Sequence, residues 1–111
     1  MTVQIKKTYR GISPEMLHDE IRDLAQQEGV LVDEAKLQTY SLPSGSTQSR
    51  VTLVFKSQAK QKQCGSAHII SSPSGETKIM LDFDETLLPQ EKITSLQEKM
   101  DFVLGSYELK W

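Results

Sequence analysis

Hydrophobic and polar residues alternate along much of the chain with the two-residue period of a β-strand that buries one face. Three segments follow this pattern closely: Ala35–Leu42, Arg50–Lys56 and Glu76–Asp84. A fourth, Cys64–Ser72, is rich in β-branched residues but less regular. Turn residues, rather than helical patterns, separate these segments. The chain therefore predicts four consecutive strands, and Thr2–Arg10 alternates in the same way and predicts a strand before them.

The connection between the last two strands predicts their register. Pro73-Ser74-Gly75 suits a three-residue hairpin loop with glycine in the left-handed conformation. Directly opposed residues share a face of a sheet, so this loop gives the sheet one apolar face. That face contains Leu37, Thr39, Val51, Leu53, Phe55, Ala67, Ile69, Ile79, Leu81 and Phe83. The opposite, open face contains Lys36, Gln38, Tyr40, Arg50, Thr52, Val54, Lys56, Ser66, His68, Ile70, Lys78, Met80 and Asp82.

Two segments have the periodicity of amphipathic helices. The first begins at Ser13 and Pro14, a capping residue followed by a proline that loses no needed donor, and Gly29 ends it. Its apolar stripe is Leu17, Ile21, Leu24 and Ala25. The second opens at Pro89 and ends at Gly105. Its stripe is Ile93, Leu96, Met100, Val103 and Leu104. The tail Ser106–Trp111 either folds back onto this helix or frays.

The predicted order of elements is β-α-β-β-β-β-α, in a single α+β domain spanning residues 1–111. A helical crossover leaves the first two strands parallel, so the first strand runs antiparallel to the fifth and can pair beside it. We therefore predict a two-layer sandwich: a five-stranded antiparallel sheet in the order 1-5-4-3-2, with both helices on one face. This order of elements resembles the half-repeat of the TATA-binding protein fold. It also resembles a trimmed helix-grip fold of the birch-pollen-allergen and START type. The resemblance implies a fold and no functional residue.

Composition fits one globular domain: 111 residues, with 25% charged and 37% hydrophobic. No apolar run approaches the ~20 residues of a membrane-spanning helix, and the N-terminus lacks a signal-peptide core. Cys64 is the single cysteine, so an internal disulfide is excluded. Together these features favour a cytoplasmic protein without a membrane partner.

The formal net charge of −2 hides a polarity along the chain. Residues 13–34 contain seven acids and one arginine, whereas residues 35–63 contain five bases and no acid. The bases on the open face predict attraction for phosphate or for an acidic protein surface. The alternative is that strand lysines merely solvate an exposed face and discourage edge aggregation. Nucleic acid is less favoured, because the basic excess is modest and Tyr40 is the single aromatic on this face.

Candidate catalytic groups are isolated. His68 has no second histidine or carboxylate at ligand spacing, and His18 falls on the polar side of the first helix. Cys64 lacks a predicted base and suits a small, semi-buried position. The acidic cluster Asp82, Asp84 and Glu85 is typical of a strand end. The sequence therefore predicts no catalytic residue, no metal site and no cofactor.

We predict a non-enzymatic binding or interaction module that uses the open basic face for an anionic or protein partner, including a second copy in a homodimer. The binding residues predicted on this face are Lys36, Tyr40, Arg50, Lys56, His68, Lys78 and Met80. Placing Tyr40 opposite Arg50 would add a cation–π contact. The alternative function is a carrier of small apolar ligands, as in helix-grip proteins, with a cavity between sheet and helices. That cavity would be lined by Ile5, Phe55, Ile79, Met100 and Val103.

Overall fold

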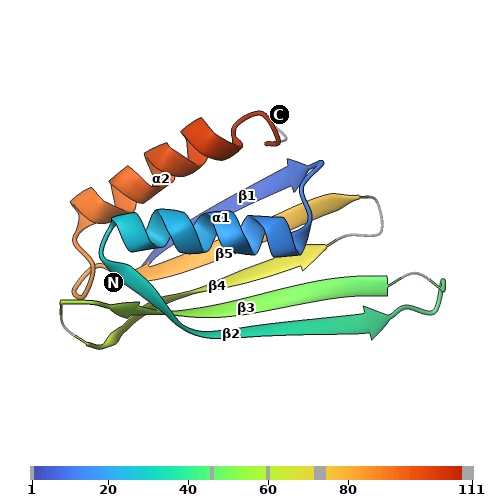
Figure 1. Ribbon diagram of the computed structural model, residues 1–111, viewed down its shortest axis with the longest axis horizontal. Coiled ribbons are helices and arrows are strands. Elements are labelled where there is room, and N and C mark those ends of the chain that lie inside the picture. The colour runs from blue at the N-terminus through green and yellow to red at the C-terminus, as the bar shows by residue number, and fades with distance from the viewer. Residues whose placement is uncertain (1, 46, 60, 72–74, 109–111) are drawn as a thin grey trace.

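The computed structural model contains one sheet with two helices on the same side of it (Figure 1). It describes residues 2–45, 47–59, 61–71 and 75–108. The elements are β1 (Thr2–Arg10), α1 (Pro14–Gln27), β2 (Val30–Ser41), β3 (Thr47–Ser57), β4 (Gln63–Ser71), β5 (Glu76–Asp84) and α2 (Gln90–Leu104). The five strands pair antiparallel in the order β1-β5-β4-β3-β2, which confirms the predicted fold class.

The register of the β4–β5 hairpin is the predicted one. Ile69 pairs with Ile79 and Ala67 pairs with Leu81, and Gly75 has a φ of 87°. Pro73 and Ser74 of the predicted loop, and Ser72 of the predicted strand, lie outside the described residues. The left-handed glycine thus closes a hairpin that directs the apolar side chains of both strands to the same face.

The two helices cover the apolar face through the predicted stripes. Ser13 caps α1, because its hydroxyl oxygen accepts a hydrogen bond from the backbone N–H of Met16 at 3.2 Å. The helix buries Pro14, Leu17, Ile21, Leu24 and Ala25. In α2 the buried residues are Ile93, Leu96, Met100 and Leu104. Val103, which was expected among them, is 41% exposed.

Two phenylalanine rings meet over a glycine in the middle of the core. Gly65 of β4 pairs with Phe55 of β3 on one side and with Phe83 of β5 on the other. Because glycine has no side chain, the two rings stack above it with centroids 5.6 Å apart. A Cβ atom at Gly65 would lie 2.3 Å from the backbone carbonyl oxygen of Asp82. A larger residue would therefore clash at this position, because the neighbouring strand approaches it closely.

The prediction that Leu37 and Thr39 belong to the core was wrong. Leu37 does lie opposite Val51, so its side of the sheet was predicted correctly. Nevertheless Leu37 is 56% exposed and Thr39 is also exposed, whereas Val51 is buried. Strands β2 and β3 are longer than predicted and continue past the N-terminal end of α1 (Figure 1). The helix is thus too short to cover this end of the edge strand.

The opposite edge of the sheet is joined to the segment that follows α2. The backbone N–H of Arg10 donates to the carbonyl oxygen of Tyr107 at 2.8 Å, and Tyr9 forms an isolated β-bridge with Glu108. The Lys7 amine lies 3.1 Å from Asp101 and 3.2 Å from Glu108. Residues 106–108 therefore fold back onto β1, while the rest of the tail lies outside the described residues.

Among the helices described, neither is long and apolar enough to cross a membrane.

Candidate functional site

Each of the five strands places at least one basic side chain on the open face of the sheet. Two adjacent rows of directly paired residues cross the sheet. The first row is Lys36, Thr52, His68, Met80 and Lys6. The second row is Gln38, Arg50, Ile70, Lys78 and Thr8. The lysines, the arginine and the histidine alternate between the rows, so each is a diagonal neighbour of the next, about 7–8 Å away. We call Lys6, Lys36, Arg50, His68 and Lys78 the basic band.

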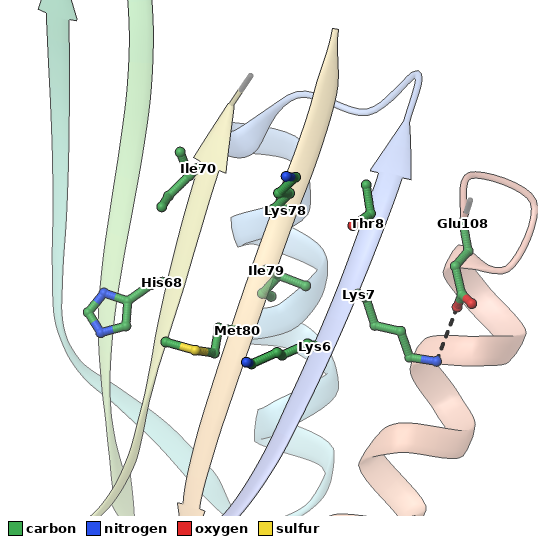
Figure 2. Close-up of a pocket in the computed structure, with 9 residues that line it drawn as sticks. All are labelled: Lys6, Lys7, Thr8, His68, Ile70, Lys78, Ile79, Met80 and Glu108. Atoms are coloured by element: carbon green, nitrogen blue, oxygen red, sulfur yellow. Dashed lines mark ion pairs between the residues drawn. The ribbon is translucent and has the colours of Figure 1, made fainter. Parts of the chain in front are cut away.

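One end of the basic band surrounds an open hollow of about 500 Å³. Figure 2 shows the side chains of Lys6, Thr8, His68, Ile70, Lys78 and Met80 from β1, β4 and β5 around it. The side chains of Ile70 and Met80 provide apolar surface between the polar groups. The ion pair of Lys7 and Glu108 also lines the hollow. Apart from that pair, the hollow combines two amines, an imidazole and a hydroxyl with an apolar floor, a set that suits an anion attached to an apolar group.

The amines of Lys6 and Lys78 and the guanidinium of Arg50 have no ion-pair partner in the described part of the chain. Two described acids of the same face have other partners. Asp82 accepts a hydrogen bond from the Gln4 amide at 3.1 Å, and Glu76 lies 3.4 Å from Arg10. Exposed cations without a carboxylate partner leave a positive potential over the two rows.

Lys7 shows the contrast, since it lies next to Lys6 but turns toward α2 (Figure 2). Burial tends to lower the pKa of its amine, but the hydrogen bonds and charges of Asp101 and Glu108 outweigh this effect and raise the pKa. Its charge is therefore used within the fold and is not available to a partner on the open face.

Five of the seven predicted binding residues lie together in the two rows: Lys36, Arg50, His68, Lys78 and Met80. The other two, Tyr40 and Lys56, also belong to this face but lie outside the rows. Lys56 is six positions beyond Arg50 along β3, about 20 Å away at the rise of a strand.

The predicted cation–π contact between Tyr40 and Arg50 was wrong. Arg50 pairs with Gln38, and Tyr40 pairs with Gln48. The Tyr40 hydroxyl instead donates a hydrogen bond to the side-chain oxygen of Gln38 at 2.6 Å. Only residues 42–46 connect β2 to β3, and β3 begins at Thr47 rather than at the predicted Arg50. The shorter connection places Tyr40 opposite Gln48, two residues away from the predicted partner.

Lys6 and Thr8 are the site residues that the sequence prediction missed. They alternate along β1 with the buried Ile5 and Tyr9, and Lys6 pairs with Met80 while Thr8 pairs with Lys78. The two-residue period of Thr2–Arg10 and the predicted pairing of the first and fifth strands together contained this signal. The alternation alone does not say which strand lies beside Lys6, and the strand pairing alone does not say which face Lys6 occupies.

The cysteine and the acidic cluster that the sequence offered as candidates for catalysis or metal binding have structural roles. Cys64 is buried, and burial raises the pKa of its thiol, which disfavours the reactive thiolate. Asp84 ends β5 and accepts hydrogen bonds from the Thr86 N–H at 2.9 Å and the Thr86 hydroxyl at 2.6 Å, as a strand-ending turn requires. In the described ranges no three His, Cys, Asp or Glu side chains gather where they could hold a metal ion.

The residues proposed to line a ligand cavity belong to the core. Ile5, Phe55, Ile79 and Met100 are all buried in the cluster that joins sheet and helices. Val103 lies outside that cluster and is exposed. These side chains fill the space that a carrier would keep for its ligand.

Comparison of the sequence with known protein families and with curated proteins finds no match.

Proposed function

We propose that this protein is a non-enzymatic binding module that holds an anionic partner on the open face of its sheet. The observation that carries the proposal is the basic band, in which Lys6, Arg50 and Lys78 face the same side without an ion-pair partner among the described residues. If these basic side chains served only to keep the sheet soluble, acidic side chains would be expected between them. A mixture of both charges gives solubility without a strong local electric field.

The weakness of exposed ion pairs limits what kind of anion can bind. One pair at a solvent-exposed site contributes about 0.2–1 kcal/mol. A small ion held by one or two lysines would therefore dissociate at millimolar concentrations or above. A partner with several charges gains from every pair at once and from the release of its counterions. The proposal therefore concerns a multivalent anion.

Self-association through the same face stays a prediction. The partly buried Met80, Ile70 and Val54 would supply apolar contact area in such a homodimer. However, a two-fold sheet-to-sheet contact would bring two basic bands together, and opposed like charges are destabilising. We therefore favour an anionic partner over a second copy. Light scattering of the wild type and of a Tyr40→Glu/Met80→Glu variant at 50 mM and 500 mM salt would separate a dimer from a monomer.

The proposal is tested by retention on immobilised heparin at 50 mM salt. We expect the wild type to be retained and to elute as salt increases. Lys6→Gln/Lys78→Gln should elute at clearly lower salt, because it removes both amines of the hollow. The matched control is Lys56→Gln/Lys62→Gln, which loses the same charge at the far end of β3 and in the following loop. Equal shifts for the two variants would mean that net charge alone causes retention, and the proposal would then be wrong.

A further inference from the structure

The basic band crosses the whole sheet, and its width restricts the shape of a ligand that uses all of it. Neighbouring strands are about 4.8 Å apart, so the band extends about 19 Å from Lys36 on β2 to Lys6 on β1. A single phosphate or sulfate group spans no more than two adjacent cations of this set. A ligand that contacts every strand must be extended and must run across the strands rather than along them.

Aromatic surface for stacking bases is absent from the two rows. The members that do not belong to the basic band are Thr8, Gln38, Thr52, Ile70 and Met80. Tyr40 lies beyond the rows, with its hydroxyl bonded to a neighbouring glutamine. Proteins that bind single-stranded nucleic acid gain about 1–3 kcal/mol from each base stacked on an aromatic ring. Without such rings, the band gives a nucleic acid its phosphate contacts and little else.

An extended polypeptide matches the spacing of the band better. In an extended peptide the side chains at positions i and i+2 point the same way and lie about 6.6–6.8 Å apart. Four carboxylates at alternate positions span three such steps, about 20 Å, which is the width of the band. Because lysine and arginine side chains are long and flexible, each of these carboxylates lies within reach of at least one basic group of the band. Small or apolar residues between them would face the surface provided by Ile70 and Met80.

Resting on the proposed function, we infer that the partner is an extended acidic polypeptide segment with carboxylates at alternate positions, lying across the five strands on the basic band. The hydroxyl groups of Thr8 and Thr52 lie in the same rows and can donate hydrogen bonds to its carbonyl oxygens. Binding of this kind is strongly weakened by salt, because each contact is an exposed ion pair.

The test uses three fluorescein-labelled probes with six negative charges along the chain. The alternating peptide repeats glutamate-serine six times, the block peptide has six glutamates followed by six serines, and the third probe is a seven-nucleotide single-stranded DNA. Fluorescence anisotropy at 50 mM salt gives their dissociation constants with the protein of residues 1–111. We expect the alternating peptide to bind at least threefold more tightly than either of the others. Equal binding of both peptides would overturn the inferred spacing. Tighter binding of the DNA would overturn the choice of a polypeptide in favour of nucleic acid.

Two single substitutions at distant parts of the band test its extent. Lys6→Gln on β1 and Arg50→Gln on β3 should each weaken binding of the alternating peptide about two- to fivefold, as the loss of one exposed pair requires. The control Lys56→Gln, on the same face but outside the rows, should leave it unchanged. A loss confined to Lys6→Gln would place the ligand in the hollow alone and overturn the crossing arrangement. If heparin retention depends on Lys6 and Lys78 but no preference for the alternating peptide appears, the proposed function stands and this inference fails.

Discussion

Replacing Gly65 by alanine should destabilise the fold through a steric clash inside the sheet. The added Cβ would lie 2.3 Å from the carbonyl oxygen of Asp82 and 2.7 Å from the ring of Phe83. Ordinary contact needs at least 3.4 Å, so β4 and β5 must separate locally by about 1 Å. Overpacking of this kind costs about 1–3 kcal/mol. Alanine recovers about 0.5–1 kcal/mol of the entropy that glycine loses in a strand, so the net loss lies within about 0–2.5 kcal/mol. We expect about 1–2 kcal/mol, because the closest clash is with backbone, which cannot move aside as a side chain can.

Thermal and urea unfolding would measure this loss. For a domain of this size 1 kcal/mol corresponds to about 4 °C, so Gly65→Ala should lower Tm by about 4–8 °C. The matched control is Ser66→Ala, one residue along β4 on the open face, which removes a hydroxyl without adding an atom to the core. A double variant with Phe83→Leu should lose less than the sum of the single changes, because the ring is one of the two clashing groups. A Tm of Gly65→Ala at or above the wild-type value would refute the close approach of β5 to this glycine.

Three further substitutions test the polar contacts that support the sheet. Lys7→Met should destabilise the protein by about 1–3 kcal/mol, because a nearly buried carboxylate loses its cation. It should also speed hydrogen exchange of the Arg10 amide, and unchanged exchange would contradict the proposed attachment of residues 106–108 to β1. The hydrogen bond from Lys99, at 2.6 Å, lowers the pKa of Glu28 despite the opposing effect of burial. The ionised Glu28 carboxylate therefore stabilises the folded state at neutral pH, and this stabilisation is lost as pH falls below the usual glutamate pKa. Urea unfolding should therefore show Glu28→Gln about 1.5 kcal/mol less stable than the wild type at pH 7, with a gap that narrows by pH 3; a constant gap would exclude the charge as its cause. Tyr9→Phe should be neutral or slightly stabilising in the same assay, because the buried hydroxyl has no hydrogen-bond partner in the described part of the protein, whereas a loss above about 1 kcal/mol would mean that the hydroxyl is satisfied.

The periodicity of the chain was enough to predict the elements and their order in the sheet. The bounds of β1 and β5 are those predicted, and both helices begin within a residue of the predicted proline starts. Local chemistry specified these features: alternation defines a face, a capping serine begins a helix, and Gly75 closes a hairpin. The parallel relation imposed by one helical crossover then left the edge beside the fifth strand as the place for the first.

The composition of the site was predicted only in part, because it depends on strands that are distant in sequence. Lys36, Arg50, His68 and Lys78 could be assigned to the open face from alternation within their own strands. Their arrangement as one band depends on the registers of four strand pairs at once. Lys6 joins it only because β1 pairs with β5, which lies far along the chain.

Alternation by itself determined which side of the sheet each strand residue faces, since the pleat fixes that choice at every second position. Tertiary structure decided which of those positions are covered and which charges are neutralised. Leu37 has the core-facing orientation but remains exposed, because the N-terminal end of α1, at Pro14, does not reach over that part of β2. Lys7 has a neighbour of the same type in Lys6, yet the carboxylates of α2 and the following turn neutralise only Lys7. Coverage and charge pairing depend on the lengths and placement of elements that pack from elsewhere in the chain, and no local pattern contains that information.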